Sequence, residues 1–382
     1  MNVVTLQQPP RIVFGPGCAA QCVDELKGRG LRRAFFVTSP PTAPLAAPLA
    51  EALRQASLEA VVYDAIDREP DIAMFTAALT AARDAAPDAV VGLGGGSALD
   101  AAKLVAALYD GRQDVRAVFG IGLLAGRSLY LACLPTTAGT GSEVSPNAIL
   151  LDEAERLKKG VISPHLLPDA AFVDPLLTVT APPGVTAATG LDALTHCIEA
   201  YANRFAHPIV DVYAREGIRL ITGHLLRAVR DGHDLPAREA VALGSLYGGL
   251  CLAPVNTAAV HALSYPLGGE YHVAHGVANA VLLPHVLSFN LPACVARYAE
   301  VAYAMGVTKA ETPEAAAAAG IERLTELSQE VGLPPGLGAL GIPREALSGL
   351  AAAAMTVTRL LKNNPRELTA ADAEAIYASA YE

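Results

Sequence analysis

The chain has 382 residues, of which 52% are hydrophobic and 17% are charged, so it is long and apolar enough for two packed domains and is not a disordered protein. Its formal net charge of −10 argues against a nucleic-acid-binding or anionic-membrane surface, since both need basic patches. An anionic ligand must therefore be held locally, by backbone N–H groups or a few lysines.

The first half of the chain alternates short apolar or β-branched runs with helical patterns such as Pro48–Ala56 and Asp71–Asp84. This alternation predicts βαβ units and a mainly parallel sheet. The predicted strands are Ala34–Thr38, Ala60–Tyr63, Ala89–Leu93, Leu129–Leu134 and Ala171–Val173.

A glycine turn made of Gly94, Gly95 and Gly96 connects the third predicted strand to a helical pattern. Glycine lets the backbone approach a phosphate closely, and Ser97 is expected to cap the helix, with Asp100 three residues further on. The helix N-terminus then offers free N–H groups and a positive dipole end to a diphosphate. The turn matches neither GxGxxG nor a Walker loop, so an ordinary tight turn remains the alternative.

A loop rich in hydroxyl side chains, Leu134–Ala148, follows the next predicted strand. Hydroxyl groups at a strand end suit contacts to ribose, phosphate or carboxamide groups, although a Ser/Thr turn explains the same composition. Its polar residues include Thr136, Thr137, Thr140, Ser142 and Asn147.

The second half of the chain loses its strand signals after Thr180 and consists of helical patterns broken by proline and glycine. We therefore expect an α/β domain at 1–180 and an all-helical domain at 181–382. Proline positions taken as helix breaks are Pro208, Pro236, Pro254, Pro284, Pro334, Pro335 and Pro365.

One segment of this half, Ala240–Gly269, contains no Asp, Glu, Lys or Arg. It also lacks the roughly 18 consecutive apolar residues of a membrane span. We expect it to form a buried helix that carries His261 into the domain core. The last helix is expected to begin at a capping box of Thr369 and Asp372.

Four residues of this half have metal-ligand chemistry: Asp192, His196, His261 and His275. Asp192 and His196 are four apart in a helical pattern, so both leave the same face of the helix. The turn-prone stretch 266–269 is expected to bring His275 back towards His261. Three imidazoles and one carboxylate suit Fe²⁺ or Zn²⁺, whereas for any single histidine a packing role is the alternative.

In this order and at these separations, the segments closely resemble the iron-containing (group III) alcohol dehydrogenase family. The matching segments are GGGSALDAAK, PTTAGTGSE, GLDALTHCIEAY and the block from His261 to His285, extended by RIVFGPG at Arg11–Gly17 and LLPDAAFVDPLLT at Leu166–Thr178. The resemblance implies a Rossmann-like, dinucleotide-binding α/β domain and an all-α C-terminal domain, the architecture of the dehydroquinate synthase-like superfamily. It also implies an active site in the cleft between them.

The resemblance assigns roles to individual residues. The metal ligands fall on Asp192, His196, His261 and His275. The cofactor-binding positions are the diphosphate turn Gly94, Gly95, Gly96 and Ser97 with Asp100 behind it, the nicotinamide-facing residues Thr136, Thr137, Thr140 and Ser142, and either Lys158 or Lys159. Asn147 and Leu252 fall where the family lines its substrate pocket.

The implied function is the interconversion of a small alcohol and its aldehyde or ketone by an NAD(P)-linked oxidoreductase. The metal, Fe²⁺ or Zn²⁺, would act as a Lewis acid on the substrate oxygen, and NAD or NADP would exchange hydride with the substrate carbon. The apolar surroundings of Asn147 and Leu252 favour short alcohols, diols or small functionalised aldehydes.

Two positions depart from the family pattern. Many members carry a histidine four residues after the third ligand, where this chain has Tyr265, and a phenol with an ordinary pKa near 10 exchanges protons poorly at neutral pH. We expect either a shifted pH optimum or a relay through His272. At Ser39, NAD-preferring members often carry an aspartate for the ribose 2′-hydroxyl, so serine predicts that NADP is tolerated or preferred.

Three other functions fit this sequence less well. Maleylacetate reductases tend to lack part of the metal set that this chain keeps. A lyase of the dehydroquinate synthase type would need a cluster of basic residues next to the ligands, and none of the arginines between Pro182 and His285 is adjacent in sequence to a ligand. A non-enzymatic nucleotide-sensing or structural role is made improbable by the intact ligand set.

The expected setting is the cytoplasm. The six cysteines show no CxxC pairing, and the first residues lack a basic segment followed by an apolar one, so a reducing compartment and no secretory signal are predicted. The expected partner is a small-molecule alcohol or aldehyde, with no nucleic acid and no membrane. The resemblance implies a homodimer or a higher homo-oligomer.

Overall fold

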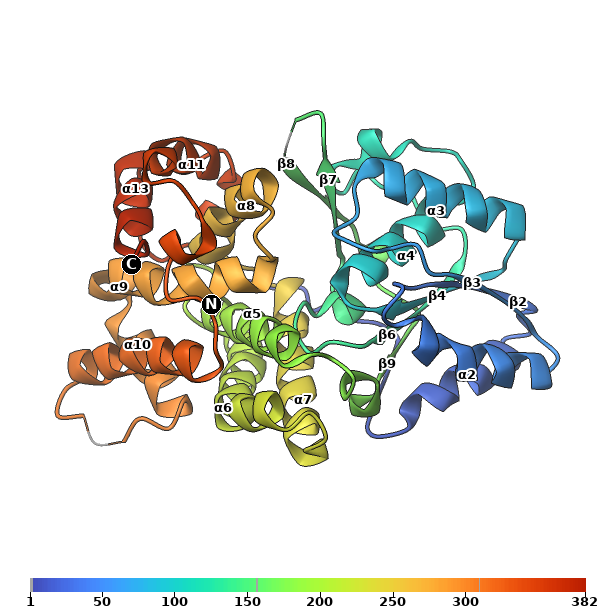
Figure 1. The fold of residues 1–382 in the computed structure, drawn as a ribbon, viewed down its shortest axis with the longest axis horizontal. Coiled ribbons are helices and arrows are strands. Elements are labelled where there is room, and N and C mark those ends of the chain that lie inside the picture. Colours follow the sequence, from blue (N-terminus) through green and yellow to red (C-terminus); the bar gives the residue numbers. More distant parts are fainter. Residues whose placement is uncertain (1–2, 156, 309) are drawn as a thin grey trace. The chain divides into compact units, whose positions relative to one another are not determined.

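The computed structural model describes residues 3–155, 157–308 and 310–382. The chain divides into two compact units (Figure 1). We call Gln7–Thr180 the α/β unit, and Ala181–Glu382 with the N-terminal residues up to Leu6 the helical unit. The expected domains, 1–180 and 181–382, differ from this division in the assignment of those first residues.

The α/β unit is built on a parallel six-stranded sheet in the order β1-β9-β6-β4-β2-β3. Its strands are β1 (Arg11–Phe14), β2 (Arg33–Val37), β3 (Glu59–Tyr63), β4 (Ala89–Gly94), β6 (Tyr130–Pro135) and β9 (Ala170–Val173). All five predicted strands are present, within about one residue of their predicted ends, and the parallel sheet is confirmed. The first strand, β1, was not predicted as a strand.

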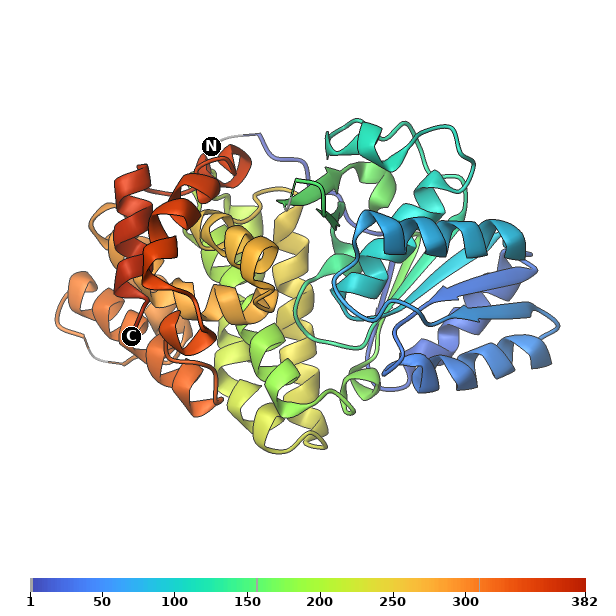
Figure 2. The ribbon, with the colours of Figure 1, turned by 45° about the horizontal axis from the view of Figure 1, so that its top comes forward.

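Helices cover both faces of this sheet because successive side chains of a strand point to opposite faces. Phe35 packs in a core with helices α3 and α4, whereas Phe36 packs in a second core with α1 and α2. Figure 2 shows the sheet nearly edge-on with a helical layer on either side. The four helices are α1 (Gln21–Gly28), α2 (Ala43–Gln55), α3 (Ile72–Ala85) and α4 (Gly96–Leu108).

A second, three-stranded sheet in the order β5-β8-β7 lies in the same unit. Its strands are β5 (Gly120–Ile121), β7 (Asn147–Asp152) and β8 (Leu157–Ile162), with β7 and β8 antiparallel. None of the three was predicted. Short 3-10 helices in this unit are Cys18–Ala20, Val115–Val118, Ser142–Val144, Pro164–Leu166 and Pro175–Thr178.

The helical unit has no strand among its described residues. Its helices are α5 (Pro183–Tyr201), α6 (Pro208–Arg230), α7 (Leu235–Leu252), α8 (Ala259–Tyr271), α9 (His275–Ala304), α10 (Pro313–Glu330), α11 (Leu347–Ala354), α12 (Thr358–Leu361) and α13 (Ala370–Ser379), with 3-10 turns at Gly338–Leu340 and Arg344–Ala346. The capping box predicted for the last helix is confirmed, since Thr369 and Asp372 accept each other's backbone N–H groups.

The prediction of one buried helix over Ala240–Gly269 is wrong, because α7 ends at Leu252 and α8 begins at Ala259. Pro254 and Asn256 lie between the two helices, and Asn256 adopts a left-handed conformation (φ 72°) that a helix interior does not contain. His261 is still delivered to the core, in the first turn of α8.

The prediction that Pro284 breaks a helix is also wrong. Pro284 and Pro292 both lie inside α9, and the helical backbone is interrupted only at Cys294, two residues after Pro292. By length and composition α9 could cross a membrane, but 56% of its most apolar window is buried inside the protein. This burial is typical of the core helix of a globular unit, which passes the same test of length and composition.

Candidate metal centre and cofactor turn

Helix α5 carries Asp192 and His196 on one buried face, one turn apart. Glycines allow two other helices to approach this face closely. A Cβ at Gly276 would overlap the backbone carbonyl of Ala188, so the first turn of α9 lies directly against α5. A Cβ at Gly248, in α7, would lie 3.3 Å from Cβ of His196.

The chain reverses between His261 and His275, but not where it was expected to. Residues 266–269 belong to α8, whose interior includes Pro266. The reversal follows at His272, which ends α8 in a left-handed conformation (φ 55°). His275 then begins α9.

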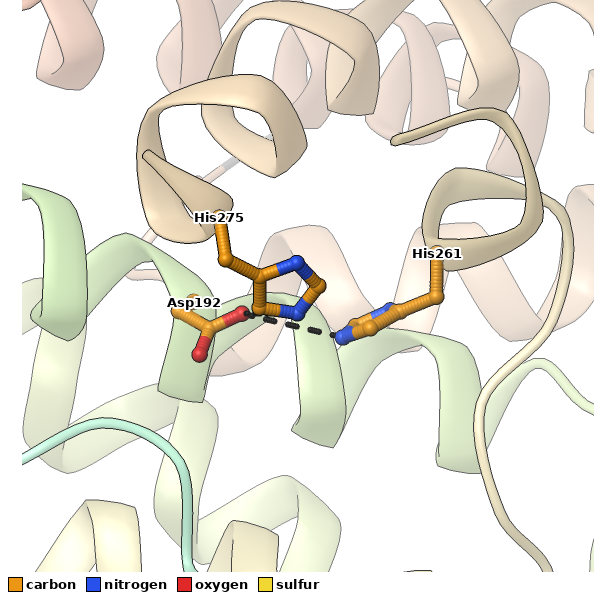
Figure 3. Close-up of side chains that lie close together, drawn as sticks. All are labelled: Asp192, His261 and His275. Atoms are coloured by element: carbon orange, nitrogen blue, oxygen red, sulfur yellow. Dashed lines mark ion pairs between the residues drawn. The ribbon is translucent and has the colours of Figure 1, made fainter. Parts of the chain in front are cut away.

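These elements bring the four predicted ligands together around the Asp192 carboxylate. Its Oδ1 lies 3.6 Å from Nε2 of His261, 3.7 Å from Nε2 of His275 and 3.9 Å from Nε2 of His196. Figure 3 shows His261 and His275 directed at this carboxylate from two different helices. The ligand atoms of Asp192, His261 and His275 all lie within 4.8 Å of one another.

The spacing suits a tetrahedral metal. Bonds of about 2.1 Å from one metal to nitrogen and oxygen ligands place neighbouring ligand atoms about 3.4 Å apart. The three separations from Oδ1 of Asp192, 3.6 to 3.9 Å, are slightly longer than this value. A buried carboxylate with three imidazoles is also a donor set for Fe²⁺ or Zn²⁺.

The electrostatics of the cluster favour a cation at this point. Burial alone raises the pKa of Asp192, but His196, His275 and His261 outweigh it and hold that pKa well below its usual range. Burial lowers the pKa of His261, yet the negative charge of Glu199 and the Asp192 carboxylate raise it to about 9. Asp192 is therefore a carboxylate at neutral pH, and either a proton or a metal ion is stabilised beside it.

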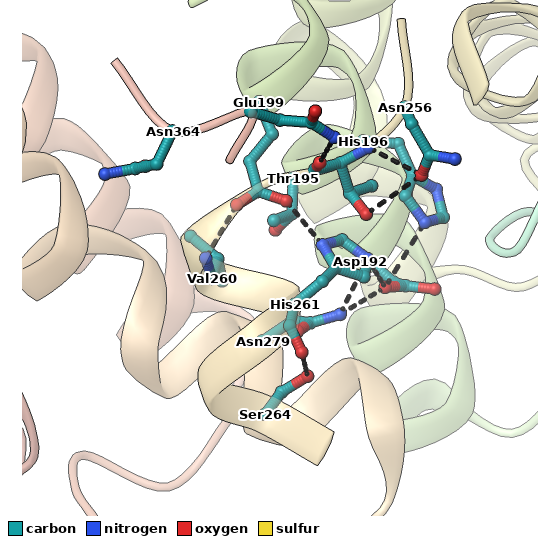
Figure 4. Close-up of polar contacts among 12 residues, drawn as sticks. Asp192, Thr195, His196, Glu199, Asn256, Val260, His261, Ser264, Asn279 and Asn364 are labelled. Atoms are coloured by element: carbon teal, nitrogen blue, oxygen red, sulfur yellow. Dashed lines mark hydrogen bonds and ion pairs between the residues drawn. The ribbon is translucent and has the colours of Figure 1, made fainter. Parts of the chain in front are cut away.

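Two residues of the cluster were missed by the sequence analysis. Glu199 accepts the backbone N–H of Val260 at 2.6 Å, and its second oxygen lies 2.6 Å from Nδ1 of His261. Asn279 Nδ2 lies 2.7 Å from Oδ1 of Asp192 and 3.2 Å from Nε2 of His261 (Figure 4). Both positions share a helix face with a predicted ligand, Glu199 three residues after His196 and Asn279 four after His275, and that spacing is the signal that could have found them.

The remaining predicted residues of the helical unit lie at different distances from the cluster. The Tyr265 ring is half-buried, with its centroid 6.1 Å from that of His275. His272 is exposed at the end of α8. Leu252 is the buried last residue of α7.

In the α/β unit, the glycine turn and the hydroxyl loop are in contact. A Cβ at Gly96 would lie 2.7 Å from Cγ2 of Thr140, and a Cβ at Gly95 would lie 3.5 Å from Oγ1 of Thr137. Thr136 donates its backbone N–H to the Gly94 carbonyl at 2.9 Å. Side chains at these glycines would fill the turn, so the turn fits close approach of a phosphate.

The prediction that Ser97 caps this helix is wrong. Helix α4 begins at Gly96, its N-cap is the extended Gly95, and no side chain caps it. The first N–H groups of α4 have no carbonyl within the helix to bind, as at any helix N-terminus. Main-chain donors, and not a serine cap, are what this turn offers to a diphosphate.

Asp100 likewise has a different partner from the expected one. Its buried carboxylate accepts the Ser142 hydroxyl at 2.5 Å and the Ile149 N–H at 2.9 Å. Lys103, one turn further on, is fully buried and donates to the carbonyls of Ser145 (2.9 Å) and Asn147 (2.8 Å). These two side chains hold the hydroxyl loop and the start of β7 in place.

The other predicted residues of this unit are placed as follows. Ser39 follows β2 and shares hydrogen bonds with Thr42, including Oγ to Oγ1 at 2.7 Å. Lys158 pairs with Glu69 at 2.7 Å, whereas Lys159 pairs with Asp152 at 3.0 Å and with Glu155 at 2.7 Å. Asn147 Oδ1 is buried and has no hydrogen-bond partner among the described residues.

Comparison with known proteins identifies the family of this chain. A family model described as "Iron-containing alcohol dehydrogenase" matches residues 9–175, and one described as "Fe-containing alcohol dehydrogenase family, C-terminal" matches residues 186–381. The chain is 41% identical to the Long-chain-alcohol dehydrogenase 1 of Geobacillus thermodenitrificans (strain NG80-2), over 100% of this chain and 98% of that protein.

Solved structures share the whole fold. A 1,3-propanediol oxidoreductase superposes with a TM-score of 0.96 at 33% identity, covering 100% of both chains. The sulfoacetaldehyde reductase of Bifidobacterium kashiwanohense, solved in complex with NAD⁺, superposes with a TM-score of 0.90 at 28% identity, covering 100% of this chain and 99% of that one. This chain therefore belongs to the iron-containing alcohol dehydrogenase family and is an oxidoreductase that interconverts alcohols with aldehydes or ketones.

Proposed function

We propose that the chain is a metal-dependent, NAD(P)-linked alcohol dehydrogenase and aldehyde reductase that acts on small substrates. The observation that carries this proposal is the convergence of Asp192 with His196, His261 and His275 in the core of the helical unit. When bound, the metal supplies a Lewis acid and the nicotinamide exchanges hydride with the substrate carbon.

The metal would be held by these four residues, which supply one negative charge and three neutral nitrogens. A divalent cation held by these four residues would favour negative charge on the substrate oxygen, which an alcohol acquires when it loses its proton and a carbonyl acquires when hydride reaches its carbon. Iron is our first choice on the family match, and zinc suits the same donors.

The dinucleotide would be held by the glycine turn and the hydroxyl loop. Main-chain N–H groups at Gly96 and Ser97 suit the diphosphate, and Thr137 and Thr140 border the turn with hydroxyl groups. Thr136 and Ser142 are buried and bound to Gly94 and Asp100, so we assign them to the shape of the loop. Lys158 is the better candidate than Lys159 for a cofactor contact, because Lys159 is divided between two carboxylates.

NADP is accepted alongside NAD in this proposal. The 2′-phosphate would meet Ser39 and Thr42, which are neutral hydroxyl groups, so like-charge repulsion is absent there. The relative solved with NAD⁺ supports the nicotinamide cofactor in general.

Tyr265 is our candidate for exchanging the proton of the substrate hydroxyl. Its ring lies beside His275, whereas His272 is exposed at the end of α8. The phenol can accept and donate one proton at Oη, as the exchange requires.

The substrate is proposed to be a short alcohol, a diol or a small functionalised aldehyde. Asn147 supports one polar contact, since its buried Oδ1 has no partner among the described residues. Leu252 supplies an apolar surface. A reducing, cytoplasmic setting is supported by six buried free cysteines, and a homodimer or higher homo-oligomer by family resemblance alone.

The test is an activity screen of the full chain, loaded separately with Fe²⁺ and with Zn²⁺, against aldehydes and alcohols of two to eight carbons, roughly the range of small metabolites. Oxidation of NADH and NADPH is followed with the aldehydes, and reduction of NAD⁺ and NADP⁺ with the alcohols. We expect turnover with at least one metal and one small aldehyde, and none after the metal is removed. Turnover that is unaffected by metal removal would contradict the proposal.

A further inference from the structure

Glu199 lies in α5, three residues after His196 and seven after Asp192, so it continues the face that carries both ligands. Its side chain is about 4% exposed. Among the described residues its ion-pair partner is His261 alone. Burial of a carboxylate with no lysine or arginine beside it destabilises the fold unless hydrogen-bond donors and a positive charge compensate for the lost hydration.

Each carboxylate oxygen of Glu199 has one defined donor in α8. Oε1 accepts the N–H of Val260, which lies in the first turn of α8 and has no carbonyl to bind within the helix. Oε2 lies 2.6 Å from Nδ1 of His261, the next residue. Two successive residues of α8, one through its main chain and one through its ring, are therefore fixed by one carboxylate (Figure 4).

These contacts determine which ring nitrogen of His261 carries the proton. An ionised carboxylate only accepts hydrogen bonds, so Nδ1 must be the N–H. On the other side of the ring, Nε2 lies 3.6 Å from Oδ1 of Asp192, and the Asn279 amide nitrogen lies 3.2 Å from Nε2 of both His261 and His275. With Nδ1 occupied by Glu199, Nε2 is the ring atom that faces Asp192 and His275 and is available to a metal ion.

We propose that Glu199 is a positioning residue of the metal centre, which fixes His261 in its Nδ1–H tautomer and adds a second negative charge beside the cation. Asp192 would then be a ligand of the cation, whereas Glu199 would act through the His261 ring. This inference rests on the proposed metal-dependent function.

The isosteric change Glu199→Gln tests this role sharply. Glutamine has one oxygen, so it cannot accept from both Val260 N–H and His261 Nδ1–H. If the oxygen stays on Val260, the amide N–H₂ faces Nδ1 and favours the Nε2–H tautomer, which opposes metal binding. The negative charge is lost in either orientation.

A matched control is Asn364→Ala. Asn364 and Glu199 line the same small cavity, but Asn364 bonds to Asn290 and to the Arg366 carbonyl and does not contact His261. The control therefore disturbs buried polar packing nearby without touching the ligand set.

The experiment measures the Zn²⁺ affinity of the full-length wild type, Glu199→Gln and Asn364→Ala by competition with a chromophoric chelator. We expect Glu199→Gln to bind Zn²⁺ about 10–100-fold more weakly and the control to stay within about twofold. Equal affinities in wild type and Glu199→Gln would overturn the inference alone. A wild type that binds no Zn²⁺ would overturn the proposed function, and the inference with it.

A second measurement does not depend on the folding of the Glu199→Gln variant. In the Zn²⁺-loaded wild type with ¹⁵N-labelled histidine, a long-range ¹H–¹⁵N spectrum reports the protonated ring nitrogen, with His261 assigned by its absence in His261→Ala. We expect a proton on Nδ1 and none on Nε2. A His261 ring protonated on Nε2 overturns the proposal.

Discussion

Ionisable side chains with low exposure have different partners in the two units. In the helical unit, Asp192 and three histidines point their polar atoms at one another, 3.6 to 3.9 Å from a single carboxylate oxygen. In the α/β unit, Asp100 and Lys103 point theirs at the main chain and hydroxyl groups of a loop.

This difference separates a binding site from a scaffold. The contacts of Asp100 and Lys103 end on the hydroxyl loop and on the start of β7, so the two side chains shape this segment and need no ligand. The lone pairs of the Asp192 cluster converge on one another, which stabilises the cluster only when a cation joins it. Substitutions of Asp100 or Lys103 are expected to change the stability of the fold. Substitutions in the Asp192 cluster are expected to change metal binding and turnover.

The largest effect is expected from Asp192→Asn. Loss of the carboxylate removes the negative charge that binds the cation, so the site loses its Lewis acid. The metal contributes several kcal/mol of transition-state stabilisation, so kcat/KM should fall on the order of 10³-fold. Steady-state kinetics and metal content measure it together. Asp231→Asn, an exposed aspartate after α6, is the control, and equal kinetics for the two variants would remove Asp192 from the site.

Lys103→Met is expected to destabilise the protein and to leave metal binding intact. It leaves two buried carbonyls without their donor and Asp100 without a nearby cation, at a cost of about 3–4 kcal/mol. Urea denaturation followed by fluorescence measures this cost. A variant of normal stability that has lost turnover would make Lys103 part of the catalytic site and would remove the distinction between the clusters.

Glu143→Gln is expected to change how stability depends on pH. Burial raises the pKa of Glu143 to about 7, above its value in the unfolded chain, so its contribution is complete below about pH 4.5 and is lost as the pH rises through 7. Between pH 5 and 8.5 the free energy of unfolding of the wild type should therefore fall by about 1–3 kcal/mol, and that of the glutamine variant should not show this fall. Parallel stability curves for the two proteins would contradict the burial argument.

Ser39→Asp is expected to shift cofactor preference towards NAD. A carboxylate binds the ribose 2′-hydroxyl and repels a 2′-phosphate, so the ratio of kcat/KM for NAD over NADP should rise by about tenfold or more, about 1.4 kcal/mol. Ser39→Asn, similar in size and uncharged, should change the ratio much less. An unchanged ratio in the aspartate variant would place the adenosine ribose away from β2.

The smallest effect is expected from Tyr265→His. An imidazole with an ordinary pKa near 6.5 exchanges protons at neutral pH better than a phenol, so the alkaline limb of the pH–rate profile should move to lower pH. Tyr265→Phe, which has no ionisable group at this position, should lower turnover and remove this limb. Identical profiles for all three proteins would exclude Tyr265 from proton exchange.

The sequence predicted the parts of this molecule whose signals are local. The spacing of Asp192 and His196 places both on one face of a helix, and the apolar runs from Ala34 to Val173 match strands of the parallel sheet. The family resemblance supplied the assembly of the four ligands. Strand β7 escaped prediction because it follows directly on a loop rich in turn-forming residues, and β8 because its sequence LKKGVI contains two lysines and a glycine, which are depleted in strands.

Glu199 escaped prediction for a different reason. A glutamate in a helix is usually solvated, and its partners here are Val260 and His261, about sixty residues away in the sequence. The spacing after His196 places Glu199 on the ligand face of α5, and its contacts with the first turn of α8 show that the carboxylate is buried. The helix break between Leu252 and Ala259 was obscured similarly, since an uncharged, apolar segment has the composition of a continuous core helix.

The central claim is that Asp192 and the three histidines bind one divalent metal on which turnover depends. The most direct measurement is the metal content of the full-length protein, determined alongside NAD(P)-linked alcohol oxidation while the metal is removed by a chelator and then restored. We predict one Fe²⁺ or Zn²⁺ per chain, with activity that falls and returns in proportion to occupancy. Full activity in a metal-free protein would contradict the account.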